Sequence, residues 1–84
     1  MDRSKTFLIV GLGLLGGKYA QVLSGKGYRV LGIDRDPAAV SYARAHDYIV
    51  EGAAENFAPL IEQADYVIFG LYPTALLAWV ETYA

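Results

Sequence analysis

Cysteine is absent from this chain of 84 residues, and histidine occurs only once. Without cysteine there can be neither a disulfide framework nor thiolate chemistry. A single histidine leaves too few nitrogen and sulfur ligands for a zinc site. We therefore expect no metal centre, and the lack of cysteine fits a cytoplasmic protein.

Long apolar runs and clusters of basic residues are missing as well. Gly, Lys or Pro interrupts every apolar stretch well short of the roughly 20 residues that span a bilayer. The polar start of the chain, residues 1–6, lacks the small-residue cleavage site of a signal peptide. The net charge is −2 without any basic run, which argues against nucleic acid as a partner. We expect neither a membrane nor a nucleic acid to be bound.

The most informative stretch runs from residue 7 to residue 17. Its first part, Phe-Leu-Ile-Val, has the length and apolar character of a fully buried strand. A glycine-rich segment of the form G-x-G-x-x-G follows, with its glycines at Gly11, Gly13 and Gly16. A helical pattern comes next, and a second apolar run at 30–33 ends in Asp34. Strand, glycine turn, helix, strand and acid together are typical of a dinucleotide-binding βαβ unit.

Apolar runs and turn residues predict strands that alternate with helices. The expected strands are 6–10, 29–33, 48–50 and 66–71, and the expected helices are 14–24, 37–45, 56–63 and one that begins at Tyr72. Asp36 is expected to cap the second helix, with Pro37 at its first position. This pattern predicts an α/β fold, a partial Rossmann (doubly wound) unit with four parallel strands in the order 3-2-1-4 and flanking helices.

The first helix carries apolar residues at helical spacing. Leu15, Tyr19 and Val22, with Leu23 beside them, are expected to form its apolar face. Hydrophobic residues make up 55% of the chain, more than a small domain needs. A complete doubly wound domain takes about 150 residues. We therefore expect residues 1–84 to be the N-terminal part of a dinucleotide-binding domain, with apolar surface left for more chain or a partner.

Each glycine of the motif has its own physical role. Gly11 allows a sharp exit from the strand, Gly13 lets a pyrophosphate approach the backbone, and Gly16 lets the helix pack closely on the strands. Backbone N–H groups of Leu14 and Leu15, with the helix dipole, then suit a diphosphate. The alternative is a glycine turn in an α/β domain that binds nothing.

The acid at the end of the second strand distinguishes between dinucleotides. The Asp34 carboxylate can accept hydrogen bonds from the adenosine ribose and would repel a 2′-phosphate, so we expect NAD rather than NADP. Arg35 leaves two readings open, because it could stack on the adenine or attract a 2′-phosphate. FAD fits the spacing from Gly11 to Asp34 less well than a nicotinamide cofactor does.

Several segments of the sequence resemble the N-terminal domain of prephenate dehydrogenases. These enzymes oxidatively decarboxylate prephenate to 4-hydroxyphenylpyruvate in tyrosine biosynthesis. The matching segments are residues 9–17, 32–37 and 64–68. Residues 71–74 look like the family's segment that carries a proline beside the cofactor. The resemblance implies NAD as cofactor, prephenate as substrate of the parent enzyme and a homodimeric parent. The predicted cofactor-binding residues are Gly11, Leu12, Gly13, Leu14, Leu15, Gly16, Asp34, Arg35, Leu71, Tyr72 and Pro73.

The family's catalytic histidine and substrate-binding arginines lie beyond the last residue of this chain. We therefore expect no catalytic residue here, an absent catalytic helical domain, and a fragment that is inactive alone and prone to self-association. Tyr72 could line the nicotinamide ribose site or pack at the start of the last helix. A different class of function, a stand-alone nucleotide-sensing module without hydride chemistry, would use the same glycine turn.

Overall fold

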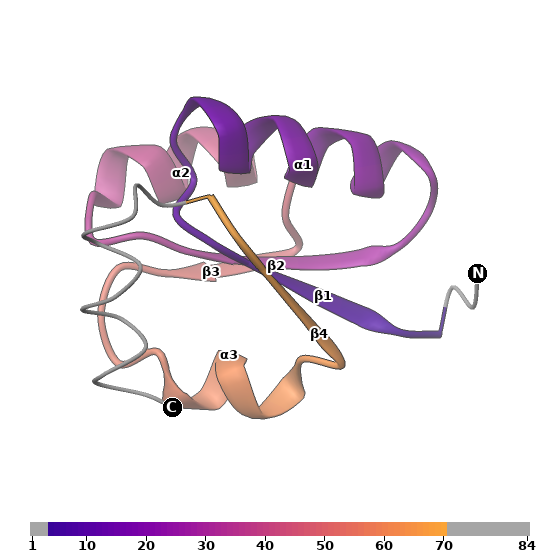
Figure 1. Ribbon diagram of the computed structural model, residues 1–84. Helices are drawn as coiled ribbons and strands as arrows, with labels where there is room; N and C mark the ends of the chain where they lie inside the picture. Colours follow the sequence, from indigo (N-terminus) through magenta and orange to yellow (C-terminus); the bar gives the residue numbers. More distant parts are fainter. Residues whose placement is uncertain (1–3, 71–84) are drawn as a thin grey trace.

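The computed structural model describes residues 4–70, which form a parallel four-stranded sheet with helices on both faces (Figure 1). The strand order is β3-β2-β1-β4, so the predicted α/β topology is confirmed. In chain order the elements are β1 (Thr6–Val10), α1 (Leu14–Gly25), β2 (Arg29–Ile33), α2 (Pro37–Ala45), β3 (Glu51–Ala53), α3 (Ala58–Gln63) and β4 (Tyr66–Phe69).

Strand β1 lies inside the sheet between β2 and β4, and all five of its residues are buried. Leu8 and Val10 belong to a core cluster on the α3 side of the sheet, together with Leu60. Ile9 belongs to a second cluster on the side covered by α1 and α2, with Ala20. Helices cover both faces (Figure 1), which explains why the strand sequence shows no alternation of apolar and polar residues.

Helix α2 begins as its sequence predicts. Asp36 stands at the N-cap in extended conformation, and its side chain accepts a hydrogen bond of 3.0 Å from the backbone N–H of Ala38. Pro37 occupies the first position of the helix, where an N–H would have no intrahelical partner. Helix α3 also begins close to the expected residue, with Pro59 in its first turn.

The third strand lies three residues later than predicted. The expected strand 48–50 is a connection, and β3 pairs with β2 through Gly52 opposite Gly32. Ile49 is buried against α2 and β2 and Tyr48 packs partly against the same cluster, whereas Val50 is exposed. The strand itself follows at the edge of the sheet. The strand passes close to α2 at Gly52, where a Cβ would lie 2.7 Å from Cγ1 of Val40 and 2.8 Å from Cδ1 of Ile49.

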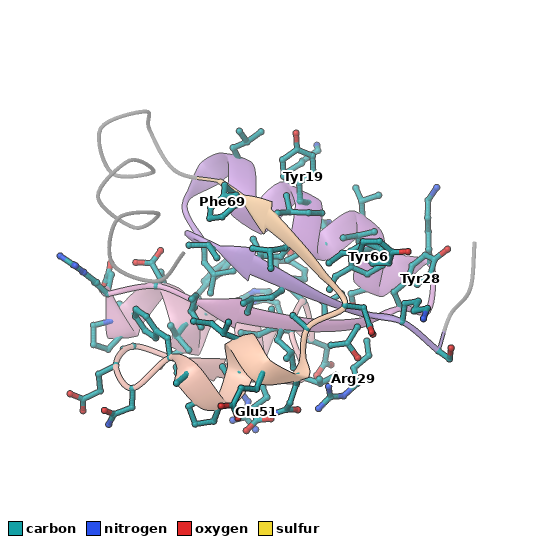
Figure 2. All side chains as sticks on the ribbon, turned by 60° about the horizontal axis from the view of Figure 1, so that its bottom comes forward. Tyr19, Tyr28, Arg29, Glu51, Tyr66 and Phe69 are labelled. Atoms are coloured by element: carbon teal, nitrogen blue, oxygen red, sulfur yellow. The ribbon has the colours of Figure 1, made fainter. Side chains whose placement is uncertain are left out.

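Of the four residues predicted to form the apolar face of α1, only Leu23 packs against the core. Leu15, Tyr19 and Val22 are exposed, with 56%, 42% and 46% of their surfaces accessible. The buried positions are Gly16 and Ala20, four residues apart. Small residues let the helix axis approach the sheet closely, so the side with the bulky residues faces outward, as Tyr19 does in Figure 2. Apolar spacing detected the helix, but it did not identify the face that packs.

The amino ends of the strands are joined by rings and polar contacts. The Phe7 ring packs edge-on against Tyr28 at 5.2 Å and stacks on Tyr66 at 5.1 Å between centroids, and the two tyrosines lie at the same end of the sheet in Figure 2. The backbone N–H of Thr6 donates to the Asp65 carboxylate at 2.7 Å. These contacts leave the carboxyl ends of the strands as the end available to a ligand.

Strand β4 ends at Phe69, so the part of the fourth strand predicted at Leu71 and the helix predicted from Tyr72 lie outside the described residues. None of the helices within residues 4–70 has the length and apolar character needed to cross a bilayer.

The orientation of α1 predicts how two matched substitutions affect stability. Leu15→Ala, on the exposed face of α1, is expected to change the free energy of unfolding by less than about 0.5 kcal/mol. Leu60→Ala, in α3 and 3% exposed, is expected to lower it by about 2–5 kcal/mol through loss of packing and a cavity. Urea denaturation measures both. Equal losses in the two variants would mean that Leu15 is packed, contrary to the structure.

Candidate functional site

The glycine turn between β1 and α1 forms the centre of the candidate site. Gly11 has a φ of 91°, in the left-handed region that favours glycine. Its N–H donates a hydrogen bond of 2.8 Å to the carbonyl of Ile33, the last residue of β2. The turn therefore leaves β1 sharply while it stays attached to the neighbouring strand, as the sequence predicts for this glycine.

Gly16 is where α1 meets the turn. A Cβ on this residue would overlap the Gly11 carbonyl oxygen and would lie 2.8 Å from the Gly11 carbonyl carbon and 3.2 Å from Cγ2 of Ile9. No rotation of a side chain relieves an overlap with backbone. The close packing predicted for the third glycine is confirmed, and its partner is the carbonyl of the first glycine.

Gly13 provides open space at the beginning of α1. It is exposed, and a Cβ built on it would meet no atom within 4 Å. It is also the N-cap of α1, with no side-chain capping hydrogen bond and no acidic residue in the first helical turn. The first N–H groups of a helix have no partner within the helix. An anion placed over Gly13 would supply the acceptors that the sequence omits.

Asp34 is held at the end of β2 by the backbone on two sides. Its Oδ2 accepts from the N–H of Leu12 at 2.8 Å, and its Oδ1 accepts from the N–H of Asp36 at 2.9 Å. Asp34 thus joins the glycine turn to the start of α2 with a fixed orientation. An ionised carboxylate has about four acceptor sites, so each oxygen keeps capacity for one hydroxyl donor.

Leu12 contributes shape to the turn. Its side chain is buried and lies against Gly32, where a Cβ would come within 2.8 Å of its Cδ1. Its N–H is already bonded to Asp34. Arg35 is exposed beside that carboxylate, and the α1 N-terminus at Leu14 borders Gly13.

The structure brings the predicted residues of the turn and Asp34 together at one end of the sheet, whereas Leu71, Tyr72 and Pro73 lie outside the described residues. Binding by any of them stays a prediction. Gly70 was not predicted as part of the site, although its Cα lies tightly packed against the backbone of Gly11 and Gly16. The available signal was a glycine at the end of an apolar strand, at the same end of the sheet as the motif.

Comparison with known proteins agrees with this geometry. Residues 7–70 match the family model of the TrkA-N domain. Among solved structures, the chain is similar to the crystal structure of prephenate dehydrogenase from A. aeolicus in complex with hydroxyphenyl propionate and NAD+. The sequences are 32% identical and the TM-score is 0.68.

The match to that enzyme covers 77% of this chain but only 23% of the enzyme's chain. No curated protein matches the sequence. The similarity to this solved structure confirms the resemblance to prephenate dehydrogenases that the motifs indicated. The chain belongs to the TrkA-N domain family, with a Rossmann-like fold of the dinucleotide-binding kind that resembles the N-terminal part of prephenate dehydrogenase.

Proposed function

We propose that this chain binds NAD and is the cofactor-binding part of an NAD-dependent prephenate dehydrogenase. The observation that carries the proposal is the uncapped start of α1, opened by Gly13, at the same end of the sheet as the fixed carboxylate of Asp34. One feature suits a diphosphate and the other suits ribose hydroxyls. Together they fit the ribose and the diphosphate of an adenosine diphosphate group.

The residues of the chain would bind and orient the cofactor. Backbone N–H groups at the start of α1 would donate to the diphosphate, and Asp34 would accept from the ribose hydroxyls. Bound NAD supplies a hydride acceptor. We assign no catalytic residue to this chain.

Preference for NAD over NADP follows from the restraint on Asp34. Because two backbone N–H groups hold this carboxylate, it cannot easily turn away from a 2′-phosphate. Charge repulsion between the Asp34 carboxylate and a 2′-phosphate would therefore disfavour NADP. Arg35 is exposed and free of this restraint, so its attraction for a phosphate would be weakened by solvent.

The substrate and the assembly are proposed on the resemblance. The similar enzyme holds hydroxyphenyl propionate together with NAD+, and this supports prephenate as the substrate of the protein in which this domain acts. A homodimeric parent belongs to the same proposal. This chain spans 23% of that enzyme's chain, so we propose that it does not catalyse the reaction alone.

A nucleotide-sensing module is the second candidate. The TrkA-N match over residues 7–70 covers the turn and Asp34, which a sensor and an enzyme would share. The two candidates separate when the full-length gene product is assayed. NAD binding with prephenate-dependent NADH formation supports the dehydrogenase, and NAD binding with no turnover of prephenate or arogenate supports the sensor.

Isothermal titration of the chain with NAD tests the binding site itself. Saturable binding at a single site is expected, with weaker binding of NADP. If neither dinucleotide binds at millimolar concentration, the proposed function is wrong.

Charge removal at Asp34 tests the ribose contact. Asp34→Asn is expected to narrow the ratio of NAD to NADP affinity by about tenfold, because a charged hydrogen bond of about 1.5–3 kcal/mol is lost and the repulsion of a 2′-phosphate disappears. Asp36→Asn is the matched control, since asparagine also caps a helix and the charge change is the same. Calorimetry measures both ratios, and an unchanged ratio in Asp34→Asn would exclude this residue from the ribose site.

A methyl group at position 13 tests where the diphosphate lies. Gly13→Ala is expected to alter the free energy of unfolding by no more than about 1 kcal/mol, because the added Cβ meets nothing. Its affinity for NAD should fall by about tenfold, since the methyl group would occupy the approach of the pyrophosphate. Urea denaturation and calorimetry measure the two effects separately. Undiminished NAD affinity in the folded variant would show that the diphosphate does not pass over Gly13.

A further inference from the structure

A glycine at the end of β4 lies against the glycine turn. A Cβ on Gly70 would come within 2.6 Å of the Gly16 Cα, 2.8 Å of the Gly16 N and 2.8 Å of the Gly11 carbonyl oxygen. All three of these atoms are backbone atoms, so no side chain can move aside to admit a methyl group. Gly70 has no left-handed φ. Its requirement for glycine is therefore one of space and not of conformation.

Gly70 is also anchored. Its N–H donates a hydrogen bond of 2.8 Å to the carbonyl of Val10, the last residue of β1. β4 pairs with β1 up to this point, with Phe69 opposite Val10. Because Gly70 is tied to β1, a larger residue there could not retreat without breaking the ladder. The turn and the start of α1 would have to move instead.

The atoms that would move are those of the candidate site. Gly16 is the third residue of α1, so its N–H is one of the first-turn groups that have no intrahelical partner. The Gly11 carbonyl belongs to the residue with the left-handed φ at which the turn leaves β1. A group that presses on both would shift the N–H groups that the diphosphate is proposed to use.

We infer that Gly70 is a positioning residue for diphosphate binding, which acts through Gly11 and Gly16 and does not touch the ligand. This inference rests on the proposed function of the turn. It adds that three segments set the geometry of the phosphate site, namely the end of β1, the first turn of α1 and the end of β4. The motif G-x-G-x-x-G contains only the first two.

The experiment compares two ligands on three proteins. The chain, Gly70→Ala and Gly25→Ala are titrated with ADP and with adenosine and followed by amide chemical shifts. Gly25 is the matched control, because a Cβ there meets nothing within 4 Å. In Gly70→Ala the affinity for ADP is expected to fall by about tenfold or more while that for adenosine changes by less than about twofold. Gly25→Ala should bind both ligands as the unsubstituted chain does.

A general loss of structure would weaken both ligands equally, so the ratio of ADP to adenosine affinity separates positioning from folding. An unchanged ratio in a folded Gly70→Ala overturns the inference and leaves the proposed function intact. Failure of the unsubstituted chain to bind ADP overturns the proposed function, and the inference with it.

Amide shifts of the unsubstituted chain test the inference even if Gly70→Ala does not fold. ADP should then shift the amide signals of Gly70 and Gly16 while adenosine leaves Gly70 unchanged, because only the diphosphate contacts the first turn of α1. Identical shifts of Gly70 with both ligands, or none with either while the Gly16 amide responds to ADP, would overturn it.

Discussion

The backbone contact between Gly16 and Gly11 is the constraint on which the rest of this fold depends. It places the first turn of α1 directly on the end of β1, where a Cβ on Gly16 would overlap the Gly11 carbonyl. A helix held this close at its start fully buries only small residues there, and Ala20 lies buried one turn after Gly16, while Leu23 packs partly against the core further along the helix. The bulky side of α1 is therefore directed away from the sheet. Close packing at the turn and the exposed apolar surface of α1 have a single cause.

The same contact organises the polar chemistry at this end of the sheet. The N-cap of α1 is Gly13, which offers no capping side chain and leaves open space at the start of the helix. Asp34 completes the arrangement from β2, since its carboxylate accepts from the N–H of Leu12 in the turn. One carboxylate thus both fixes the loop and keeps acceptor capacity for a ligand. The aromatic packing around Phe7 stabilises the opposite end of the sheet, so the aromatic cluster and the candidate binding site lie at the two ends of the strands.

The sequence predicts the features that have local causes and misses those that depend on contacts between distant segments. The limits of β1 and β2, the cap at Asp36 and the strand order follow from signals within a few residues and from the right-handed crossover rule. The position of β3 is set by its pairing with β2, with Gly52 opposite Gly32 and close to Val40, and the buried face of α1 depends on its approach to β1. Gly70 is invisible to motif spacing, because its neighbours are more than fifty positions away in the sequence. These features depend on small residues that let neighbouring atoms approach closely, whereas apolar periodicity detects only large apolar side chains.

Backbone contacts of this kind tie ligand binding to folding in the β1–α1–β4 junction. A diphosphate at the start of α1 would supply acceptors to N–H groups that the folded chain otherwise leaves to water. Those groups exist in this arrangement only when Gly11, Gly16 and Gly70 are packed together. A ligand that binds only the folded state stabilises it by RT ln(1 + [L]/Kd). This stabilisation would oppose local opening at the start of α1, because the N–H groups that bind the ligand lie there. These glycines therefore have two roles, since the close packing of Gly11, Gly16 and Gly70 allows the junction to form and also positions the N–H groups of the candidate binding site.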